Sequence, residues 1–406
     1  MTKKSSTPAI RFKGFTDTWE QRKLGELAVF NPKEEIPDVF EYVDLESVVG
    51  TEMLSHRTEE KATAPSRAQR LAHTGDLFYQ TVRPYQKNNY LFEKPDKHYV
   101  FSTGYAQLRP FIDGYFLLGL VQNGQFVKTV LDNCTGTSYP AINANDLAEI
   151  EVFSPKDEQE HHQIGTYFRN LDNLITLHQR KLDKLHNIKK ACLEKMFPKN
   201  GSSVPEIRFK GFSDAWEQRE LWELTIWDKK FNEVEAEKQP KIIKYPYVLA
   251  DVFSKIEDAS GDVRLLSTGN YIGYTTDEKA GKNLCVGEVV AIPWGGVPNI
   301  KYYKGKFVTA DNRIATSNDT ETLGNRFLSL YLEHNLAFLQ SIYRGASIKH
   351  PSMNDVLSMQ ISIPHIQEQR EIENWFANLD NLITLHQREL EKLKNLKKAC
   401  LEKMFV

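Results

Sequence analysis

Residues 171–197 read LDNLITLHQRKLDKLHNIKKACLEKMF, and residues 379–405 read LDNLITLHQRELEKLKNLKKACLEKMF. The two stretches differ at four of their 27 positions and lie 208 residues apart. A repeat this faithful marks a duplicated structural unit, and its Leu- and Lys-rich composition is typical of a helix. The chain is therefore predicted to consist of two half-molecules in tandem, each ending in the same long helix.

Apolar residues in both copies recur at alternating steps of four and three residues, with one histidine in each stripe. This spacing indicates a coiled-coil seam, and two helices with the same stripe are expected to pair with each other, antiparallel. The alternative is an amphipathic helix that packs against its own domain. The predicted seam residues are Leu171, Ile175, His178, Leu182 and Leu185, with Leu379, Ile383, His386, Leu390 and Leu393. We interpret the two histidines as core residues that set the register.

A second repeat precedes each variable region. Residues 8–24 read PAIRFKGFTDTWEQRKL, and residues 205–221 read PEIRFKGFSDAWEQREL. Its aromatic residues are predicted to be apolar side chains that dock another subunit. They are Phe15 and Trp19 in the first copy and Phe212 and Trp216 in the second.

The segments between the repeats, 25–153 and 222–361, differ in sequence but share a skeleton. Gly75-Asp76 and Gly287-Glu288 both read as a turn entering a buried strand, and apolar helical patterns follow. We predict an α+β chain with two mixed α/β globular domains, two long antiparallel helices and an internal pseudo-twofold repeat. The predicted divisions are 1–153 for the first repeat segment and domain, 154–198 for the central helix, 199–363 for the second repeat segment and domain, and 364–406 for the C-terminal helix.

Composition excludes several classes of protein. The 406 residues are 40% hydrophobic and 26% charged, and the net charge of −2 rules out DNA binding by global attraction. No apolar run is long enough to span a bilayer, and no signal-peptide core follows the first lysines, so a cytoplasmic protein is expected. Four scattered cysteines favour neither disulfides nor a zinc site.

Chemical motifs are missing as well. Neither a phosphate-binding glycine loop nor a Ser–His–Asp or Cys–His arrangement is recognisable. Asn31-Pro32-Lys33 does not match the motif of amino-methyltransferases, and adjacent His161 and His162 read as solvated histidines in the first turns of a helix. We therefore expect no catalytic site, no metal and no cofactor in this chain.

Two windows contain no acidic residue. Residues 77–92, LFYQTVRPYQKNNYLF, and 289–308, VVAIPWGGVPNIKYYKGKFV, both follow the Gly-acid dipeptides. Arg, Gln and Asn can bond base edges, and lysines neutralise phosphates, so both windows are candidate DNA-reading surfaces. Polar loops with solvated lysines are the alternative. The candidates in these windows are Tyr79, Arg83, Tyr85, Gln86, Lys87 and Asn88, with Trp294, Asn299 and Lys301.

A second candidate surface is expected near the helix junctions. It comprises Ser138 and Tyr139 in the first half, and Arg344, Ser347 and Lys349 in the second.

The order of the two repeats resembles the DNA-specificity subunit of type I restriction–modification systems. The residues that carry the resemblance are the Arg-Phe-Lys-Gly-Phe…Trp-Glu-Gln-Arg blocks at 11–22 and 208–219, and the long helices that end in Met-Phe. The resemblance extends over the whole chain. It implies two target-recognition domains, each reading one half of a split sequence in double-stranded DNA, with the helices setting the spacer.

The resemblance also implies partners. The subunit is expected to be non-catalytic and to carry two modification subunits, which methylate adenine with S-adenosylmethionine, and restriction subunits, which translocate and cut DNA. A coiled-coil structural adaptor that binds proteins rather than DNA is the alternative reading, and an enzyme that acts directly on DNA is a third. The acid-free windows count against the adaptor, and the missing motifs count against the enzyme.

Overall fold

The computed structural model describes residues 7–95, 98–136, 138–199 and 202–406. Residues 1–6, 96–97 and 137 of the predicted first segment and residues 200–201 of the predicted second segment lie outside these ranges. The chain divides into two compact units: unit 1 comprises residues 1–181 and 386–406, and unit 2 comprises residues 182–385. Each unit therefore holds the first part of one long helix and the last part of the other, α4 (Glu158–Lys195) and α11 (Ile366–Lys403).

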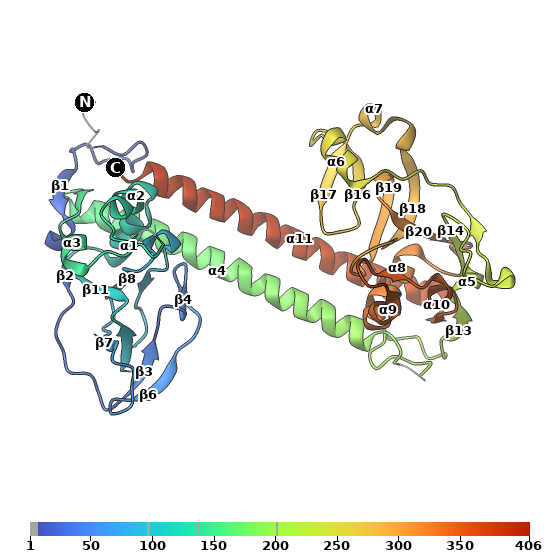
Figure 1. The fold of residues 1–406 in the computed structure, drawn as a ribbon, viewed down its shortest axis with the longest axis horizontal. Coiled ribbons are helices and arrows are strands. Elements are labelled where there is room, and N and C mark those ends of the chain that lie inside the picture. Colours follow the sequence, from blue (N-terminus) through green and yellow to red (C-terminus); the bar gives the residue numbers. More distant parts are fainter. Residues whose placement is uncertain (1–6, 96–97, 137, 200–201) are drawn as a thin grey trace. The chain divides into compact units, whose positions relative to one another are not determined.

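Unit 1 contains two four-stranded sheets, ordered β2-β11-β8-β9 and β6-β3-β10-β7, and the pairs β1-β12 and β4-β5. Its helices α1, α2 and α3 gather around β2, β11 and β8 (Figure 1). The elements are β1 (Glu20–Lys23), β2 (Ala28–Phe30), β3 (Val39–Val43), β4 (Val48–Val49), β5 (Glu52–Met53), β6 (Arg57–Glu60), β7 (Ala68–Leu71), β8 (Leu77–Gln80), β9 (Tyr90–Leu91), β10 (Tyr99–Ser102), β11 (Tyr105–Pro110), α1 (Gly114–Gln122), α2 (Gly124–Asp132), α3 (Ala144–Ala148) and β12 (Glu151–Ser154).

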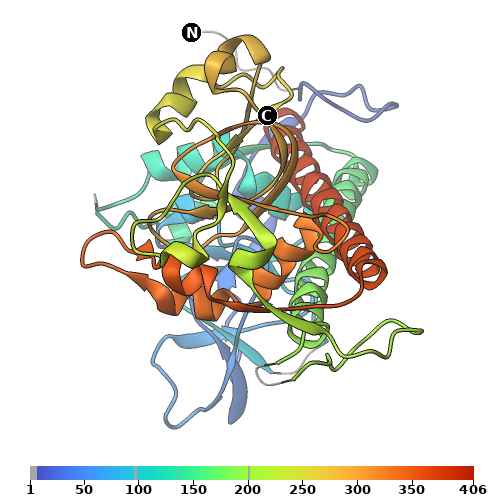
Figure 2. The ribbon, with the colours of Figure 1, turned by 90° about the vertical axis from the view of Figure 1, so that its right-hand side faces the viewer.

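Unit 2 contains a seven-stranded sheet, ordered β15-β14-β20-β18-β19-β16-β17, and the pairs β13-β23 and β21-β22. Figures 1 and 2 place α8, α9 and α10 together, away from α6 and α7. The elements are β13 (Glu217–Glu220), α5 (Leu221–Leu224), β14 (Thr225–Trp227), β15 (Lys241–Ile242), α6 (Ala250–Ile256), β16 (Val263–Leu266), β17 (Ile272–Thr275), α7 (Asp277–Ala280), β18 (Cys285–Pro293), β19 (Lys301–Thr309), β20 (Asn312–Ser317), α8 (Asn325–His334), α9 (Leu336–Ile342), β21 (Tyr343–Arg344), β22 (His350–Pro351), α10 (Met353–Leu357) and β23 (Gln360–Ile363).

The two units share one skeleton. The strand order β2-β11-β8 in unit 1 corresponds to β14-β20-β18 in unit 2, and the pair β1-β12 corresponds to β13-β23. Three helices follow in each unit, α1 to α3 and α8 to α10. The predicted fold class, two mixed domains with two long helices, is confirmed. The predicted alignment of the Gly-acid dipeptides is wrong, because Gly75-Asp76 precedes β8 whereas Gly287-Glu288 lies inside β18.

Each unit closes its core with a phenylalanine at the end of a long helix. In unit 1, the Phe405 ring lies 6.3 Å from that of Trp19 and 5.4 Å from that of Phe116. In unit 2, the Phe197 ring lies 6.0 Å from that of Trp216 and 5.5 Å from that of Phe327.

The predicted docking role of Trp19 and Trp216 is therefore wrong, because both side chains are buried in these cores. Phe15 and Phe212 of the same repeat are half-buried. An aromatic residue that closes a core and one that docks a partner produce the same sequence pattern, so the repeat by itself could not distinguish the two roles.

A buried ion pair joins the short repeat to the start of each long helix. Arg11 donates two hydrogen bonds to Glu160, at 2.6 and 2.7 Å, and Arg208 donates two to Glu368, both at 2.7 Å. Both glutamate side chains are only 1% exposed. Glu160 is therefore the counterpart of Glu368, 208 residues earlier in the chain.

His161, next to Glu160, is not the solvated histidine that the sequence suggested. Its Nε2 lies 2.8 Å from the Ser154 hydroxyl, and its ring packs 4.5 Å from that of Phe116. Burial lowers the pKa of His161, so the neutral ring is favoured. His162 is exposed.

The long helices pair within each unit. In unit 1, Asp172 accepts a hydrogen bond from Lys397 at 2.5 Å, and the Nδ1 atoms of His178 and His386 lie 3.1 Å apart. Numbers rise along one helix as they fall along the other, so the pair is antiparallel. Seam residues in both units are buried or half-buried: Leu171, Ile175, His178, Leu182, Leu185, Leu379, Ile383, His386, Leu390 and Leu393.

We expect Arg11→Ala and Arg208→Ala to lower the free energy of unfolding by about 3–5 kcal/mol, because each leaves a buried carboxylate without its partner. The loss should be larger for Arg208→Ala. Glu160 keeps a bond from the Trp19 indole at 3.3 Å, whereas the Trp216 indole nitrogen has no partner among the described residues. Urea unfolding of the purified variants measures both losses.

Arg22→Ala is the matched control, because Arg22 and Glu20 form an exposed pair that should contribute less than about 1 kcal/mol. Equal losses for Arg11→Ala and Arg22→Ala would contradict the role given to the buried pair.

Candidate nucleic-acid interface

Two loops of unit 1 meet beyond the end of β8. The Arg83 amide donates to the Pro140 carbonyl at 2.8 Å, the Ile142 amide donates to the Thr81 carbonyl at 3.0 Å, and Val82 bridges Ala141. We call residues 81–89 and 138–142 the paired loops of unit 1. They unite the first acid-free window with Ser138 and Tyr139, which the sequence had assigned to separate surfaces.

Unit 2 carries the same device beyond the end of β18. The Gly296 amide donates to the Lys349 carbonyl at 3.0 Å, and the Tyr343 hydroxyl donates to the Pro293 carbonyl at 2.8 Å. We call residues 294–300 and 344–351 the paired loops of unit 2. Because the amide bonds of Arg83 and Gly296 correspond, these two residues occupy equivalent positions.

Three of the predicted DNA-binding residues of unit 1 have structural partners. Tyr79 lies in the core, 6.0 Å ring to ring from Phe126, so its assignment to the surface is wrong. Lys87 turns inward and donates from Nζ to the Gln122 carbonyl at 2.8 Å, and burial lowers its pKa. Asn88 accepts from the Gly50 amide at 2.8 Å, which fixes the turn between β4 and β5.

The other predicted residues of these loops lie at the surface, with Arg83 half-buried. Tyr85, Gln86, Ser138 and Tyr139 are exposed, and Tyr139 reaches 64% exposure. The Arg83 guanidinium lies 4.4 Å from the centre of the Tyr139 ring, a cation–π stack. The paired loops of unit 1 therefore present a flat aromatic and cationic surface.

A buried polar cluster supports this surface from below. Gln80, only 3% exposed, donates from Nε2 to the Gln86 side-chain oxygen at 2.8 Å and to the Val82 carbonyl at 2.6 Å. Asn89 accepts from the Gln80 amide at 2.9 Å. Gln80 and Asn89 were not among the predicted site residues, although both lie in the first window. What could have indicated them in the sequence is a polar residue beside an apolar strand: Gln80 ends β8, and Asn89 directly precedes β9.

In unit 2, Trp294 lies between two other side chains. The Arg313 guanidinium is 3.9 Å from its ring, and the His350 ring is 5.0 Å away. Asn299 donates to the Asn270 side chain at 2.8 Å, and Arg344 forms an ion pair with Asp355 at 2.8 Å. Ser347 and Lys349 are exposed.

The second window contains no acidic residue in sequence, but in the fold acidic residues from outside the window lie next to its lysines. Lys304 pairs with Glu288 at 2.9 Å, and Lys306 pairs with Asp277 at 2.7 Å. Lys301 is half-buried and donates to the Ser267 carbonyl at 2.7 Å. The partners lie outside the window in sequence, so a run without acids did not predict an unpaired basic surface.

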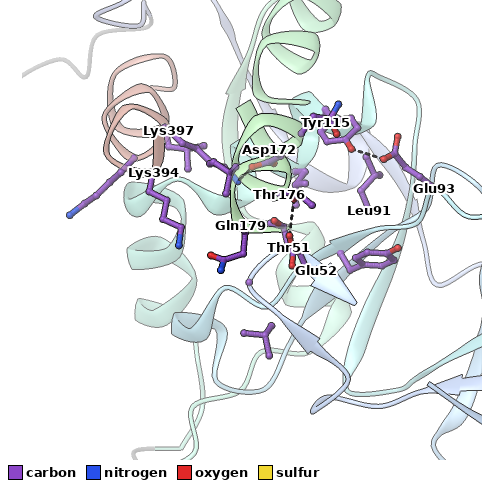
Figure 3. Close-up of a pocket in the computed structure, with 18 residues that line it drawn as sticks. Thr51, Glu52, Leu91, Glu93, Tyr115, Asp172, Thr176, Gln179, Lys394 and Lys397 are labelled. Atoms are coloured by element: carbon purple, nitrogen blue, oxygen red, sulfur yellow. Dashed lines mark hydrogen bonds and ion pairs between the residues drawn. The ribbon is translucent and has the colours of Figure 1, made fainter. Parts of the chain in front are cut away.

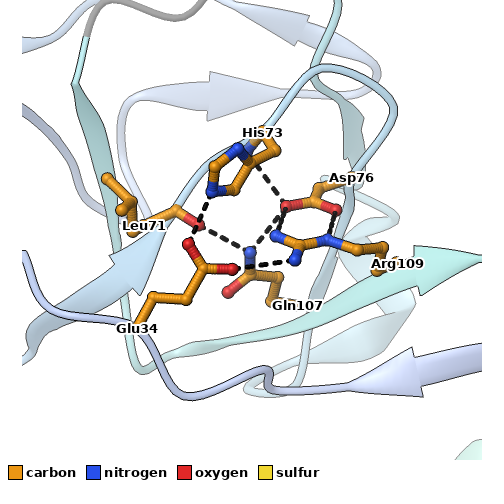
Figure 4. A network of polar contacts seen from close by, with 6 residues as sticks. All are labelled: Glu34, Leu71, His73, Asp76, Gln107 and Arg109. Carbon is orange, nitrogen blue, oxygen red and sulfur yellow. Dashed lines mark hydrogen bonds and ion pairs between the residues drawn. The ribbon is translucent and has the colours of Figure 1, made fainter.

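A polar network fixes β8 at the end opposite to its loop (Figure 4). Asp76, which directly precedes β8, accepts from Arg109 at 2.9 and 3.0 Å and from Gln107 at 2.7 Å. Gln107 also donates to the Leu71 carbonyl at 2.7 Å, which ties the two four-stranded sheets together. Glu34 bridges Arg109 and His73, and the bond from Arg109 lowers the pKa of Glu34.

A cleft of about 560 Å³ lies between the β4-β5 hairpin and the two long helices in unit 1 (Figure 3). Its lining holds as many carboxylates as lysines: Glu52, Glu93 and Asp172, with Lys394, Lys397 and Lys398. Lys397 pairs with Asp172, and Glu52 accepts from the Thr176 hydroxyl at 2.9 Å. In the part of the chain that the structure describes, no cluster of three or more His, Cys, Asp or Glu side chains could hold a metal ion. No described helix is both long and apolar enough to cross a membrane.

Two domains that carry the same loop pair, in a chain with duplicated long helices, define a tandem recognition protein. The chain belongs to the family of type I restriction modification DNA specificity domains, whose model matches residues 58–187 and 214–395. These ranges cover more than half of the chain, so the resemblance drawn from the repeats is confirmed.

Individual relatives agree. The chain is 24% identical over 296 residues to a putative type I restriction enzyme MjaX specificity subunit from Methanocaldococcus jannaschii, covering 71% of this chain and 66% of that relative, just under two thirds. The fold of the present chain is similar to that of the S subunit of a type I restriction-modification system from M. genitalium. The TM-score is 0.69 at 14% identity, and 98% of this chain and 99% of that chain are covered. A chain from a structure of type I R-M complex assembly and conformational transition has a TM-score of 0.50 at 20% identity, with 94% and 96% covered.

Lys301 generates a pH prediction. Burial, with the charge of Arg264, lowers its pKa from 10.5 to about 8. Between these values the unfolded chain holds a proton that the folded chain has released, so stability should rise with pH across this window. We expect wild-type protein to gain stability relative to Lys301→Met from about pH 8 to pH 10, in urea unfolding at a series of pH values. A constant difference would contradict the lowered pKa.

Proposed function

We propose that the chain is the sequence-specific, non-catalytic DNA-binding subunit of a type I restriction–modification complex. The observation that carries the proposal is the duplicated loop pair in a chain of the DNA specificity family. In both units the loops follow the equivalent strand, β8 or β18, and are held by the same amide-to-carbonyl bond. Because double-stranded DNA is the proposed ligand, the cytoplasm is the proposed compartment.

Two reading domains offer more discrimination than one. A mismatched base pair costs roughly 1–3 kcal/mol, so a half-site of a few base pairs separates targets only moderately. A second domain on the same chain adds its own discrimination, because its contact becomes intramolecular once the first has formed. We propose that residues 1–153 and 199–363 each read one half-site and that the helices at 154–198 and 364–406 set the gap.

We propose two modification subunits, which use S-adenosylmethionine, and restriction subunits as protein partners. With Trp19 and Trp216 buried, the exposed leucines of the long helices replace them as candidate docking residues. Leu174 and Leu177 are 43% and 46% exposed on α4, and Leu382 and Leu385 are 44% and 52% exposed on α11. The two pairs are 208 residues apart, so the duplication offers two equivalent sites.

We expect cells that express the chain with its modification subunit to gain methylation at a split motif, two short constant blocks around a fixed gap. A genome-wide methylation map with and without the chain measures this. Methylation at one continuous site would contradict the two-domain arrangement. No new methylation from an assembled complex would overturn DNA recognition and favour the adaptor.

A matched insertion tests whether the helices set the gap. His178 and His386 face each other, so seven residues inserted directly after each would lie side by side and preserve the seam repeat. Seven residues add about 10.5 Å of helix, close to three base pairs of roughly 3.4 Å. The gap should lengthen by about three base pairs. An unchanged gap would contradict the spacer role of the helices.

We expect Leu174→Glu/Leu177→Glu to reduce co-purification of the modification subunit at one site, and the further pair Leu382→Glu/Leu385→Glu to abolish it. A charge in an apolar interface must be desolvated without a partner, whereas on a free surface it costs little. The stoichiometry of the complex by native mass spectrometry measures the effect. Thr384→Glu, at an exposed position of the same helix, is the control. Full binding by the quadruple variant would place the docking surface elsewhere.

A further inference from the structure

At one position of the paired loops, unit 1 has an arginine in the left-handed backbone region where unit 2 has a glycine. Arg83 has φ of 54°, and its counterpart Gly296 has φ of 100°. Both amides make the equivalent bond, to Pro140 and Lys349. Glycine adopts this left-handed region freely, whereas the Cβ of any other residue approaches its own backbone there. Arg83 also precedes Pro84, whose ring restricts it further.

The loop itself does not require the arginine. In unit 2 the same amide bond forms with glycine, and Ile348 occupies the position that corresponds to Tyr139. Ile348 and Tyr139 are both strongly exposed, at 60% and 64%. Strained residues persist where the side chain has a use that outweighs the strain, most often at binding sites. The side chain of Arg83 is therefore the feature to explain.

Tyr139 leaves the guanidinium edge of Arg83 available. The stack at 4.4 Å covers one face of the planar group, and its N–H donors point along the plane. No carboxylate forms an ion pair with Arg83 among the described residues. A flat fork of donors, stacked on Tyr139 and without a hydrogen-bond or ion-pair partner among the described residues, matches two acceptors in one plane.

The neighbouring Gln86 is also biased toward donation. Its side-chain oxygen already accepts from the buried Gln80 at 2.8 Å, and Gln86 is exposed, so its amide N–H groups are the ones left to donate to a ligand. Lys87, the other cation of this loop, is turned inward toward the Gln122 carbonyl. Arg83 and Gln86 therefore offer donors at this point, beside the hydroxyls of Tyr85, Ser138 and Tyr139, which can donate or accept. In the major groove, guanine presents two acceptors, N7 and O6, whereas adenine presents one acceptor and one donor.

We infer that Arg83, oriented by its stack on Tyr139, reads a guanine in the half-site bound by unit 1. Tyr139 is a positioning residue, and Gln80 positions Gln86 beside it. The inference rests on the proposed DNA-binding function and deepens it. The paired loops of unit 2, with Gly296 and Ile348 at these positions, lack this reader.

The test measures methylation of duplexes that carry each of the four base pairs at every position of the unit 1 half-site, by the chain in complex with its modification subunit. Arg83→Gly should lower the preference for guanine at one position by roughly 5- to 150-fold, with the other half-site and the gap unchanged. Its melting temperature should stay the same or rise, because glycine relieves the left-handed strain.

Three further variants separate reading from structure. Arg83→Lys keeps the charge but loses the planar fork, so the preference for guanine should fall while overall binding is retained. Tyr139→Ile, which copies unit 2, should weaken the same preference, and Tyr139→Phe, which keeps the ring, should preserve it. A purely structural role would instead lower the melting temperature and affect all positions together.

The inference is overturned if Arg83→Gly retains every base preference of the unit 1 half-site, or if the position it relaxes does not carry guanine. It is also overturned if Arg83→Gly melts lower and loses both half-sites. Failure of the proposed function looks different, because the unaltered chain would then direct no split methylation at all.

Discussion

The core of each unit depends on the last residues of a long helix that begins in the other unit. Phe405 completes the core around Trp19 and Phe116, far earlier in the chain, and Phe197 completes the core around Trp216 and Phe327. Burying a phenylalanine contributes roughly 1.5–3 kcal/mol, a large share of the marginal stability of a domain. Each unit is therefore completed by the long helix that begins in the other, and the antiparallel seam follows from that exchange.

The buried Arg–Glu pairs serve the same arrangement at the other helix end. Arg11 holds the start of α4 through Glu160, and Arg208 holds the start of α11 through Glu368. Both contacts use the arginine of the short repeat, and both place charged side chains in the interior of the unit. An arginine fork that grips a carboxylate has a defined direction as well as an attraction, so it sets the angle at which each helix leaves its domain. The short repeat is thus a clamp for the helices, and its tryptophan is part of the same core.

The sequence predicted the features that depend on local repetition and failed where distant partners decide. The long helices and their stripe follow from spacing alone, because a helix brings residues three and four apart onto one face. The ion pair of Lys304 does not follow from spacing, because its partner Glu288 comes from the adjacent strand, outside the window. Likewise, the left-handed backbone of Arg83 accompanies a hydrogen bond from its amide to the Pro140 carbonyl, 57 residues later, and no local pattern shows that bond. Tyr79 follows the same rule: its place in an acid-free window suggested a surface residue, but Phe126, which packs on it, lies more than forty residues further on.

The two loop pairs show how one fold can carry two different sets of exposed side chains. Their backbones are held by the same amide-to-carbonyl bond, so the strands beneath need not change when the loop side chains do. Unit 1 places arginine, tyrosine and glutamine on this frame, and unit 2 places glycine, tryptophan and isoleucine at or beside the corresponding points. Support and variable groups are separated physically: the Asp76 network and the buried Gln80 cluster hold β8 and its loop, while the exposed edge carries the groups that differ between the units. Because the side chains of Arg83 and Tyr139 take no part in these supporting hydrogen bonds, a substitution of either one leaves the support in place, and the exposed groups of the two halves can diverge independently.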